Sequence, residues 1–192
     1  MNVNDEIFHD NTDRSREWLR EQAAAVKPEE AKASAKEQAI LHGRSLMRLG
    51  RMYMFRYMPA GHLTLPYYDT FPVIFPFRMT NHGFHGINFH YLPHTYRAVL
   101  MDNLYSLVNN EKYDESTHLQ RMTYTILNNT SRFRFFRPCV RQYLNKNVSS
   151  RFVYIPPSQW DIALFLPLER FVGATRNSIH QDSKNQIRKY SR

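Results

Sequence analysis

Four histidines form the densest group of chemically active side chains: His82, His85, His90 and His94 fall within thirteen residues. His82 and His85 have a spacing that can form one metal site across a turn. His85 and His90 lie five residues apart, which puts them on opposite faces of a strand. No cysteine or carboxylate accompanies the four histidines, whereas many zinc sites include one. We therefore expect hydrogen-bonding or surface histidines, with no bound metal and no other cofactor.

Two aspartates, Asp69 and Asp161, are the candidates for a pair of catalytic carboxylates. Residues 51–192 hold eighteen Lys and Arg but only eight Asp and Glu, so each acid is expected to pair with an arginine. Asp69 is expected to fix a turn by accepting a backbone hydrogen bond from two residues further on. The sequence contains no G-x-S-x-G, Walker or Gly-rich dinucleotide pattern. We therefore predict that the protein is not an enzyme.

A basic and aromatic segment is the third candidate site, with six basic side chains and no acidic one within twenty residues. If extended, it places Arg132 and Arg134 on one face and Phe133 and Phe135 on the other. The arginines can then contact phosphates while the aromatic rings pack inside. The equal alternative is an arginine face that holds the carboxylates of a neighbouring subunit. The predicted partner- or phosphate-binding residues are Arg132, Arg134, Arg137, Arg141 and Arg151.

The charge of the chain is concentrated outside its N-terminal part. The formal net charge is +9, yet residues 1–50 contain eight basic and nine acidic side chains. The basic remainder favours nucleic acid or an acidic protein surface as partner. The single cysteine, Cys139, rules out an intramolecular disulfide and is expected to be a small buried hydrophobic residue. No run of about 18 apolar residues and no signal peptide occur, so we expect no membrane span and an intracellular location or a particle assembled there.

The N-terminal part is predicted to be helical. Residues 12–26 carry a short apolar stripe that includes Trp18 and Leu19, and residues 29–47 are rich in good helix formers. These helices bury too little surface to pack on a core by themselves. They form either a solvated arm or an arm that docks on another chain. Docking through Trp18 and Leu19 is favoured, because a tryptophan is costly to leave in water.

The aromatic and proline-rich residues 51–97 predict a β core. Its first strand alternates so that Tyr53, Phe55 and Tyr57 share one face. Pro72 and Pro76 indicate that the strand containing them is an edge strand or sharply bent. Three further strands are expected at residues 65–69, 71–77 and 84–91, with a hairpin turn at residues 80–83.

The rest of the chain is predicted to be mainly helical. A regular apolar stripe begins after Pro93, and Pro138 is expected to start a short helix that runs through Leu144. Ser158 is a candidate N-cap. Further helices are expected at residues 116–129 and 159–165, a strand at residues 151–155, and a mobile basic tail from residue 183 onward.

Several strings resemble a small protein family of contractile-tailed, T-even-like phages. The longest are GRMYMFRY at residues 50–57, LPYYDTFP at 65–72 and GFHGINFHYLP at 83–93, and the shorter KYD, RPC, WDIA and FLP follow. The resemblance covers residues 15–185 and implies a virion-associated protein, with protection of DNA ends described for some members. Residues 58–62 depart from the family, which has a lysine-rich turn there, so the resemblance gives this loop no phosphate role.

These observations predict an α+β protein: an N-terminal helical arm at residues 1–48, a body at 49–172 built on a small antiparallel β-barrel or twisted sheet with packed helices, and a basic tail at 173–192. The expected function is a non-enzymatic structural component of a phage virion, in the neck, tail or baseplate, that is assembled in the host cytoplasm. Its partners would be other phage structural proteins in a multi-subunit assembly. The alternative is a DNA-binding protein that covers the ends of the phage genome.

Overall fold

The computed structural model describes residues 47–49, 51–100 and 134–190, together with Glu17, Arg20, Glu21 and Ala24. The side chains of residues 134–136 and 190 are not part of this description. The predicted docking residues Trp18 and Leu19, the predicted helix at 116–129 and Arg132 lie outside the described residues. The boundaries of the arm therefore stay a prediction.

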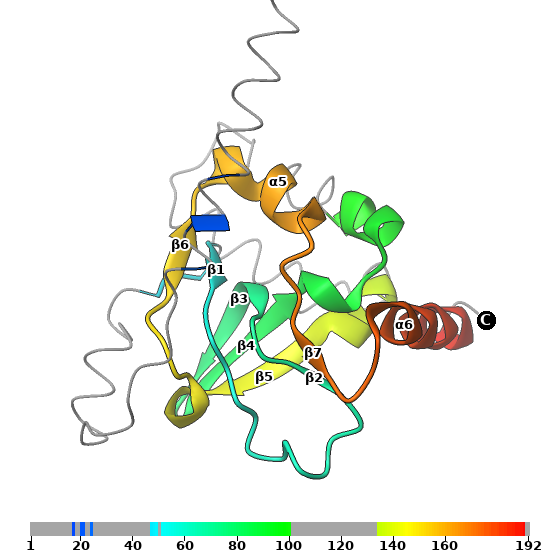
Figure 1. Cartoon of the computed structure of the whole chain (residues 1–192), viewed down its shortest axis with the longest axis horizontal. Coiled ribbons are helices and arrows are strands. Elements are labelled where there is room, and N and C mark those ends of the chain that lie inside the picture. Colours follow the sequence, from blue (N-terminus) through cyan, green and yellow to red (C-terminus); the bar gives the residue numbers. More distant parts are fainter. Residues whose placement is uncertain are drawn as a thin grey trace, which may run out of the picture.

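A five-stranded antiparallel sheet forms the centre of the fold (Figure 1). Its strand order is β5-β4-β3-β1-β6, so within the described residues β5 and β6 are its edges and no barrel closes. A small second sheet pairs β2 with β7. With the helices below, this arrangement confirms the α+β class, in the twisted-sheet form. The strands are β1 (Met52–Met54), β2 (Tyr68–Asp69), β3 (Val73–Thr80), β4 (Gly83–Asn88), β5 (Val140–Leu144), β6 (Val153–Ile155) and β7 (Phe171–Val172).

The two faces of the sheet bury different side chains. Met52 and Met54 of β1 belong to the main hydrophobic core, whereas Tyr53 and the following Phe55 and Tyr57 belong to a second, aromatic cluster. The predicted alternation, with the aromatics on one face, is therefore confirmed. In the second cluster the Phe55 ring makes edge contacts with its neighbours, for example at 5.4 Å between ring centroids with Tyr143.

β3 and β4 form the predicted hairpin, in which Thr80 pairs with Gly83. β3 lies between β4 and β1, so it is not an edge strand. The sheet accommodates its proline by a shift in register between Pro76 and Arg78, which is the bend that the prolines indicated. β4 ends earlier than predicted, because the Asn88 side chain accepts a hydrogen bond of 3.0 Å from the backbone N–H of His90. That bond starts a 3₁₀ helix, η1 (Phe89–Tyr91).

The described part of the basic segment is only partly extended. Residues 134–139 form a 3₁₀ helix, η2 (Arg134–Cys139), and the residues after Cys139 form strand β5, where a short helix was expected. β5 pairs with β4 from Val140 opposite Ile87 to Leu144 opposite Gly83. A side chain at Gly83 would collide with the carbonyl group of Tyr143, so the two strands approach as closely as they do only because this residue is glycine.

The remaining predicted elements after residue 145 are present, with differences at their ends. A short 3₁₀ helix, η3 (Asn145–Asn147), connects β5 to the strand β6. The helix expected at residues 159–165 is α5 (Trp160–Phe165), preceded by η4 (Pro157–Gln159). Its N-cap residue is Gln159 and no side chain caps it, so the role predicted for Ser158 is wrong. Residues 94–100 are helical, as predicted. No helix in the described part of the chain is long and apolar enough to cross a membrane.

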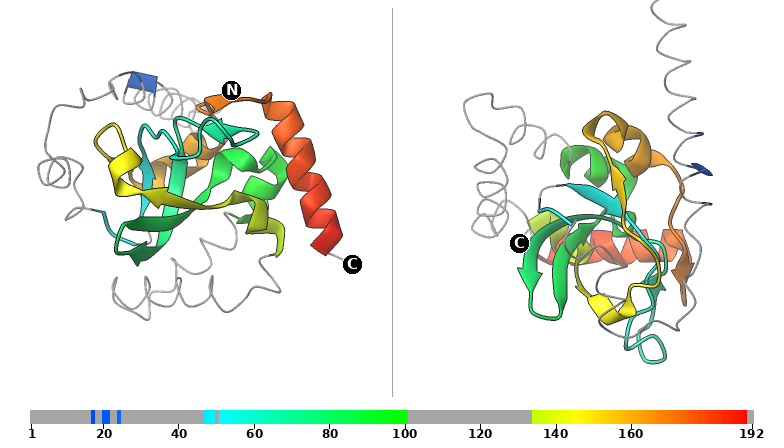
Figure 2. Two further views of the ribbon diagram at one scale, coloured as in Figure 1. Left: turned by 90° about the horizontal axis from the view of Figure 1, so that it is seen from below. Right: turned by 90° about the vertical axis from the view of Figure 1, so that its left-hand side faces the viewer.

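The C-terminal part is a packed helix, α6 (Arg176–Tyr190), which lies beside η1 and η2 (Figure 2). Ile179 and Ile187 are buried in the main core. The hydroxyl of Ser183 between them is also buried and donates a hydrogen bond of 2.7 Å to the carbonyl oxygen of Tyr91. The expectation of a mobile tail from Ser183 is therefore wrong up to Tyr190.

Three buried polar or reactive groups fix the packing around the core. The Trp160 indole N–H donates a hydrogen bond of 2.9 Å to the carbonyl oxygen of Ile155. The fully buried Arg97 guanidinium donates to the carbonyl oxygens of Leu92 and Leu164, and burial lowers the pKa of Arg97 to about 10. Cys139 is fully buried, as predicted, and burial raises the pKa of its thiol.

Candidate functional site

Asp69 is the centre of a buried hydrogen-bond network. Its Oδ1 accepts the predicted hydrogen bond from the backbone N–H of Phe71 at 2.9 Å, and a second from the backbone N–H of Arg170 at 3.2 Å. Its Oδ2 accepts from the Asn88 side chain at 3.1 Å and lies 2.6 Å from the imidazole Nδ1 of His90. The partner of this carboxylate is thus a histidine, and not the expected arginine. The network joins the β2–β7 sheet to the end of β4.

The Asp69–His90 pair links the β2–β7 sheet to η1. Both side chains are fully buried. Burial alone would raise the pKa of Asp69, but the charge interaction and hydrogen bond with His90 hold this pKa below its ordinary value. Asp161 lies elsewhere, exposed in the first turn of α5, so the two candidate carboxylates do not form one site.

The structure does not gather the four candidate histidines into one site. His82 is exposed in the β3–β4 turn, His85 is half-buried on β4, and His90 is buried against Asp69. The argument that His85 and His90 occupy opposite faces of a strand fails, because His90 belongs to η1. Among the described residues, no three histidine, cysteine or acidic side chains form a group that could hold a metal ion. That the protein binds no metal stays a prediction.

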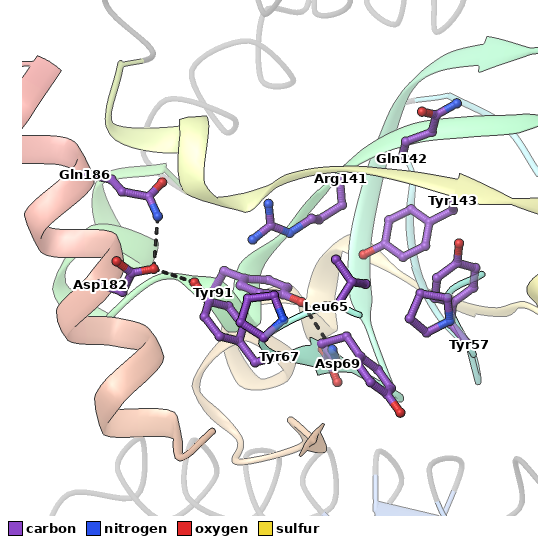
Figure 3. Close-up of a pocket in the computed structure, with 13 residues that line it drawn as sticks. Tyr57, Leu65, Tyr67, Asp69, Tyr91, Arg141, Gln142, Tyr143, Asp182 and Gln186 are labelled. Carbon is purple, nitrogen blue, oxygen red and sulfur yellow. Dashed lines mark hydrogen bonds between the residues drawn. The ribbon is translucent and has the colours of Figure 1, made fainter. Parts of the chain in front are cut away.

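A pocket of about 520 Å³ opens next to the Asp69 network (Figure 3). One wall is β5, the second is the chain from residue 57 to residue 69, and the third is the face of α6. Its size lies within the range of pockets that bind small molecules, about 300–1,000 Å³. The lining residues are Tyr57, Pro59, Leu65, Pro66, Tyr67, Tyr68, Asp69, Tyr91, Arg141, Gln142, Tyr143, Asp182 and Gln186.

Five tyrosines and one arginine give this pocket its chemical character. The guanidinium of Arg141 lies over the ring of Tyr91, at 4.1 Å from the ring centroid. Tyr67 packs against the same ring, with centroids 6.1 Å apart. Among the described residues no carboxylate forms an ion pair with Arg141. The pocket thus offers a cation, held in place by an aromatic ring, to an anionic ligand.

Helix α6 contributes a polar pair to the opposite wall. Asp182 Oδ2 accepts a hydrogen bond of 2.5 Å from the Tyr67 hydroxyl and one of 3.1 Å from the Gln186 side-chain amide (Figure 3). Burial and this bond to the Asp182 carboxylate raise the pKa of Tyr67 to about 12, so its hydroxyl stays protonated and donates. The carboxylate and the amide therefore have fixed orientations toward the pocket.

The predicted arginines do not form one patch. Arg141 lines the pocket on β5, and Arg137 is exposed in η2, directly before that strand. Arg151 is exposed two residues before β6, at the opposite edge of the sheet. The side chain of Arg134 and all of Arg132 lie outside the description. Of the predicted set, the structure thus places Arg141, with Arg137 near it in sequence, next to a cavity.

Sequence reasoning missed most of the pocket residues. Tyr67 and Tyr68 were predicted only as part of a strand at residues 65–69, and Asp182 and Gln186 belong to α6, which was predicted to be part of a basic tail. The tyrosines carried no distinctive signal, because rings that line the pocket and rings that fill the core occur in the same aromatic segments.

The described body is strongly basic and has few acids to neutralise it. Residues 51–100 and 134–190 contain fourteen Lys and Arg but only four Asp and Glu. Of the acids, Asp69 is buried against His90, and Glu169 accepts an ion pair from Arg176 at 3.1 Å. The described residues therefore carry a large excess of positive charge.

A comparison with protein families matches residues 6–185 to the family described as the phage T4 terminal DNA protecting protein. The chain belongs to this family. The predicted resemblance to a T-even-like phage family is thereby confirmed at the level of a phage protein. The family description agrees with the alternative function, cover of DNA ends, better than with a structural part of the neck, tail or baseplate. Curated proteins gave no match to the chain, and solved structures gave none.

Proposed function

We propose that this protein binds the ends of linear phage DNA and shields them from exonucleases. The observation that carries this proposal is the family match over residues 6–185, whose description names protection of terminal DNA. The basic body supports it, since its described part contains fourteen basic and only four acidic side chains, and such an excess of positive charge attracts phosphates. In this proposal the protein acts by covering the DNA end and catalyses no reaction.

Phosphate contact is assigned in this proposal to the exposed and half-exposed arginines of the predicted set. Arg137 and Arg141 flank the start of β5, and Arg151 lies at the other edge of the sheet. When one of these arginines is replaced, each phosphate contact that is lost should make the negative slope of log affinity against log salt less steep by about 0.9 for duplex DNA. The matched control is Arg176→Gln, because the Arg176 guanidinium already pairs with Glu169.

Exonuclease protection tests the function directly. A linear blunt-ended duplex is incubated with a processive exonuclease, in the absence and presence of the protein, and a restriction endonuclease with a central site serves as control. The proposal predicts that the protein slows digestion from the ends at about two molecules per duplex, while cleavage at the centre stays unchanged. Equal inhibition of both nucleases would mean that the protein coats DNA without recognising ends.

Placement of the protein in the virion, with assembly in the host cytoplasm, is part of the same proposal. A protein that guards genome ends has to be present when those ends become accessible to nucleases. Quantitative mass spectrometry of purified particles tests this placement, and a copy number of one or two per genome fits cover of DNA ends better than a repeated structural role.

A further inference from the structure

The tyrosine-lined pocket has the size and composition of a nucleotide site. A nucleobase is a flat ring with polar edges, and aromatic side chains bind it by stacking regardless of base identity. Tyr67 and Tyr68 supply such rings, and Tyr68 is only half-buried, so its ring can be reached from outside. The single arginine of the pocket, Arg141, supplies the positive charge that a phosphate needs.

We propose that this pocket holds an unpaired nucleotide of a DNA end, with its base among the tyrosine rings and its phosphate at Arg141. The inference rests on the proposed function and names the part of the DNA that the protein recognises. A nucleotide can enter a pocket of this kind only when it is unpaired, which happens at an end far more readily than within a duplex.

The polar pair on α6 sets the orientation of the bound nucleotide. The Asp182 carboxylate repels a phosphate but accepts hydrogen bonds from the amino groups of adenine, cytosine and guanine. Its Oδ2 already accepts from Tyr67 and Gln186, whereas its Oδ1 accepts no bond from any described residue. The base edge therefore points to α6, and the phosphate lies on the side of Arg141.

The loop at the mouth of the pocket favours an end over the side of a duplex. Residues 59–66 contribute Pro59, Leu65 and Pro66 to the lining. Leu63 in this loop is 88% exposed, and Leu65 is 44% exposed. The side of a duplex presents phosphates, which make no favourable contact with leucine. Its end presents the apolar face of the last base pair. Leu65 in the lining and the exposed Leu63 of the same loop thus suit the terminal base pair next to the unpaired nucleotide.

Binding of three matched duplexes tests the pocket. They carry the same sequence with blunt ends, with a single unpaired deoxycytidine at one end, or with a single unpaired thymidine, and their affinities are measured by fluorescence anisotropy at one salt concentration. We expect the tightest binding for the deoxycytidine overhang. Arg141→Gln should weaken that binding by about tenfold, as expected for loss of a charge-assisted hydrogen bond, and should affect the blunt duplex less.

Substitutions at Tyr68 separate stacking from folding. Tyr68→Phe keeps a ring and should bind the overhang like the wild type, whereas Tyr68→Ala should lose the preference for the overhang. Arg78→Gln is the control for charge, because Arg78 is exposed on β3 and does not line the pocket. Thermal melting of each variant checks that the fold is retained.

Photo-cross-linking gives a second measurement that does not depend on the variants. A 5-iododeoxycytidine at the overhang should cross-link to Tyr67, Tyr68 or Tyr91, identified by mass spectrometry of the peptides. Cross-links only outside the pocket, or equal affinity of the wild type for all three duplexes, would overturn the pocket proposal and leave end protection intact. If the protein neither binds these duplexes nor protects them from exonuclease, both the pocket proposal and the proposed function are wrong.

Discussion

The carboxylate of Asp69 and the imidazole of His90 form a pair at 2.6 Å, and both side chains are completely buried. This pair connects the β2–β7 sheet to η1, which follows β4, and the backbone N–H of Asp69 donates a hydrogen bond of 3.2 Å to the hydroxyl of the pocket residue Tyr91. The stability of the pocket therefore depends on a network whose two central side chains are buried.

Removal of the Asp69 carboxylate should strongly destabilise the protein. Asp69→Ala leaves His90, Asn88 and two backbone N–H groups without their acceptor in the interior, and breaking a buried pair costs about 3–5 kcal/mol. Urea denaturation at neutral pH measures the loss. Asp161→Ala is the control, because this aspartate is exposed and such changes usually cost less than about 0.5 kcal/mol. Equal small losses in both variants would contradict the structural role of Asp69.

The same network predicts a loss of stability in acid. The pKa of Asp69 is lowered in the folded protein, because the interaction with His90 outweighs the effect of burial. A carboxylate with a lowered folded pKa stabilises the protein at pH values above its unfolded pKa of about 4 and ceases to do so as pH falls through the folded pKa. The free energy of unfolding should therefore decline below pH 4. In Asp69→Asn this part of the pH dependence should be absent, and an unchanged profile would show that the carboxylate is not the cause.

Helix α6 should be required for the fold. Ile187→Ala removes a side chain that is 2% exposed, and a change of this kind costs about 2–5 kcal/mol. Lys189→Ala, on the exposed side of the same helix, should cost less than about 0.5 kcal/mol. Chemical denaturation followed by circular dichroism compares the two. A small loss of unfolding free energy in both variants would instead support a loosely attached tail.

Helix α6 also shows why sequence patterns were insufficient at the C-terminus. Its buried side includes Ser183, whose hydroxyl is satisfied by the Tyr91 carbonyl oxygen 92 positions earlier in the chain. A serine is typical of an exposed position, so in this helix only Ile179 and Ile187 indicated a buried face. The acceptor that makes Ser183 a core residue belongs to a distant segment, and no local pattern contains it.

Strand β5 was misread for a related reason. Only Tyr143 of its five residues is buried, because β5 is an edge strand, so the alternation typical of strands is missing. The first strand and the β3–β4 hairpin were predictable, since their periodicity and turn residues are local. The pocket combines residues near position 60, around 91, at 141–143 and at 182–186, and only the fold brings these four segments together.

Gly173 should be difficult to replace. It has a φ of +89°, which other residues rarely adopt, and a side chain there would collide with the carbonyl oxygen of Pro66 at the pocket rim. Gly173→Ala should cost about 1–3 kcal/mol, measured by urea denaturation. Gly61→Ala is the control, because its nearest neighbour is the movable side chain of the exposed Thr64. If both variants are equally stable, the backbone at Gly173 has an alternative conformation.

Recognition of DNA ends is tested most directly by one pair of ligands. A blunt duplex with two open ends is compared with a duplex of the same sequence whose ends are both closed by hairpin loops, at the same salt concentration, because salt alone changes such affinities strongly. End binding predicts that the open duplex binds at least about tenfold more tightly, a difference of about 1.4 kcal/mol. Equal affinities for the open and the closed duplex would contradict it and leave only a general attraction to DNA.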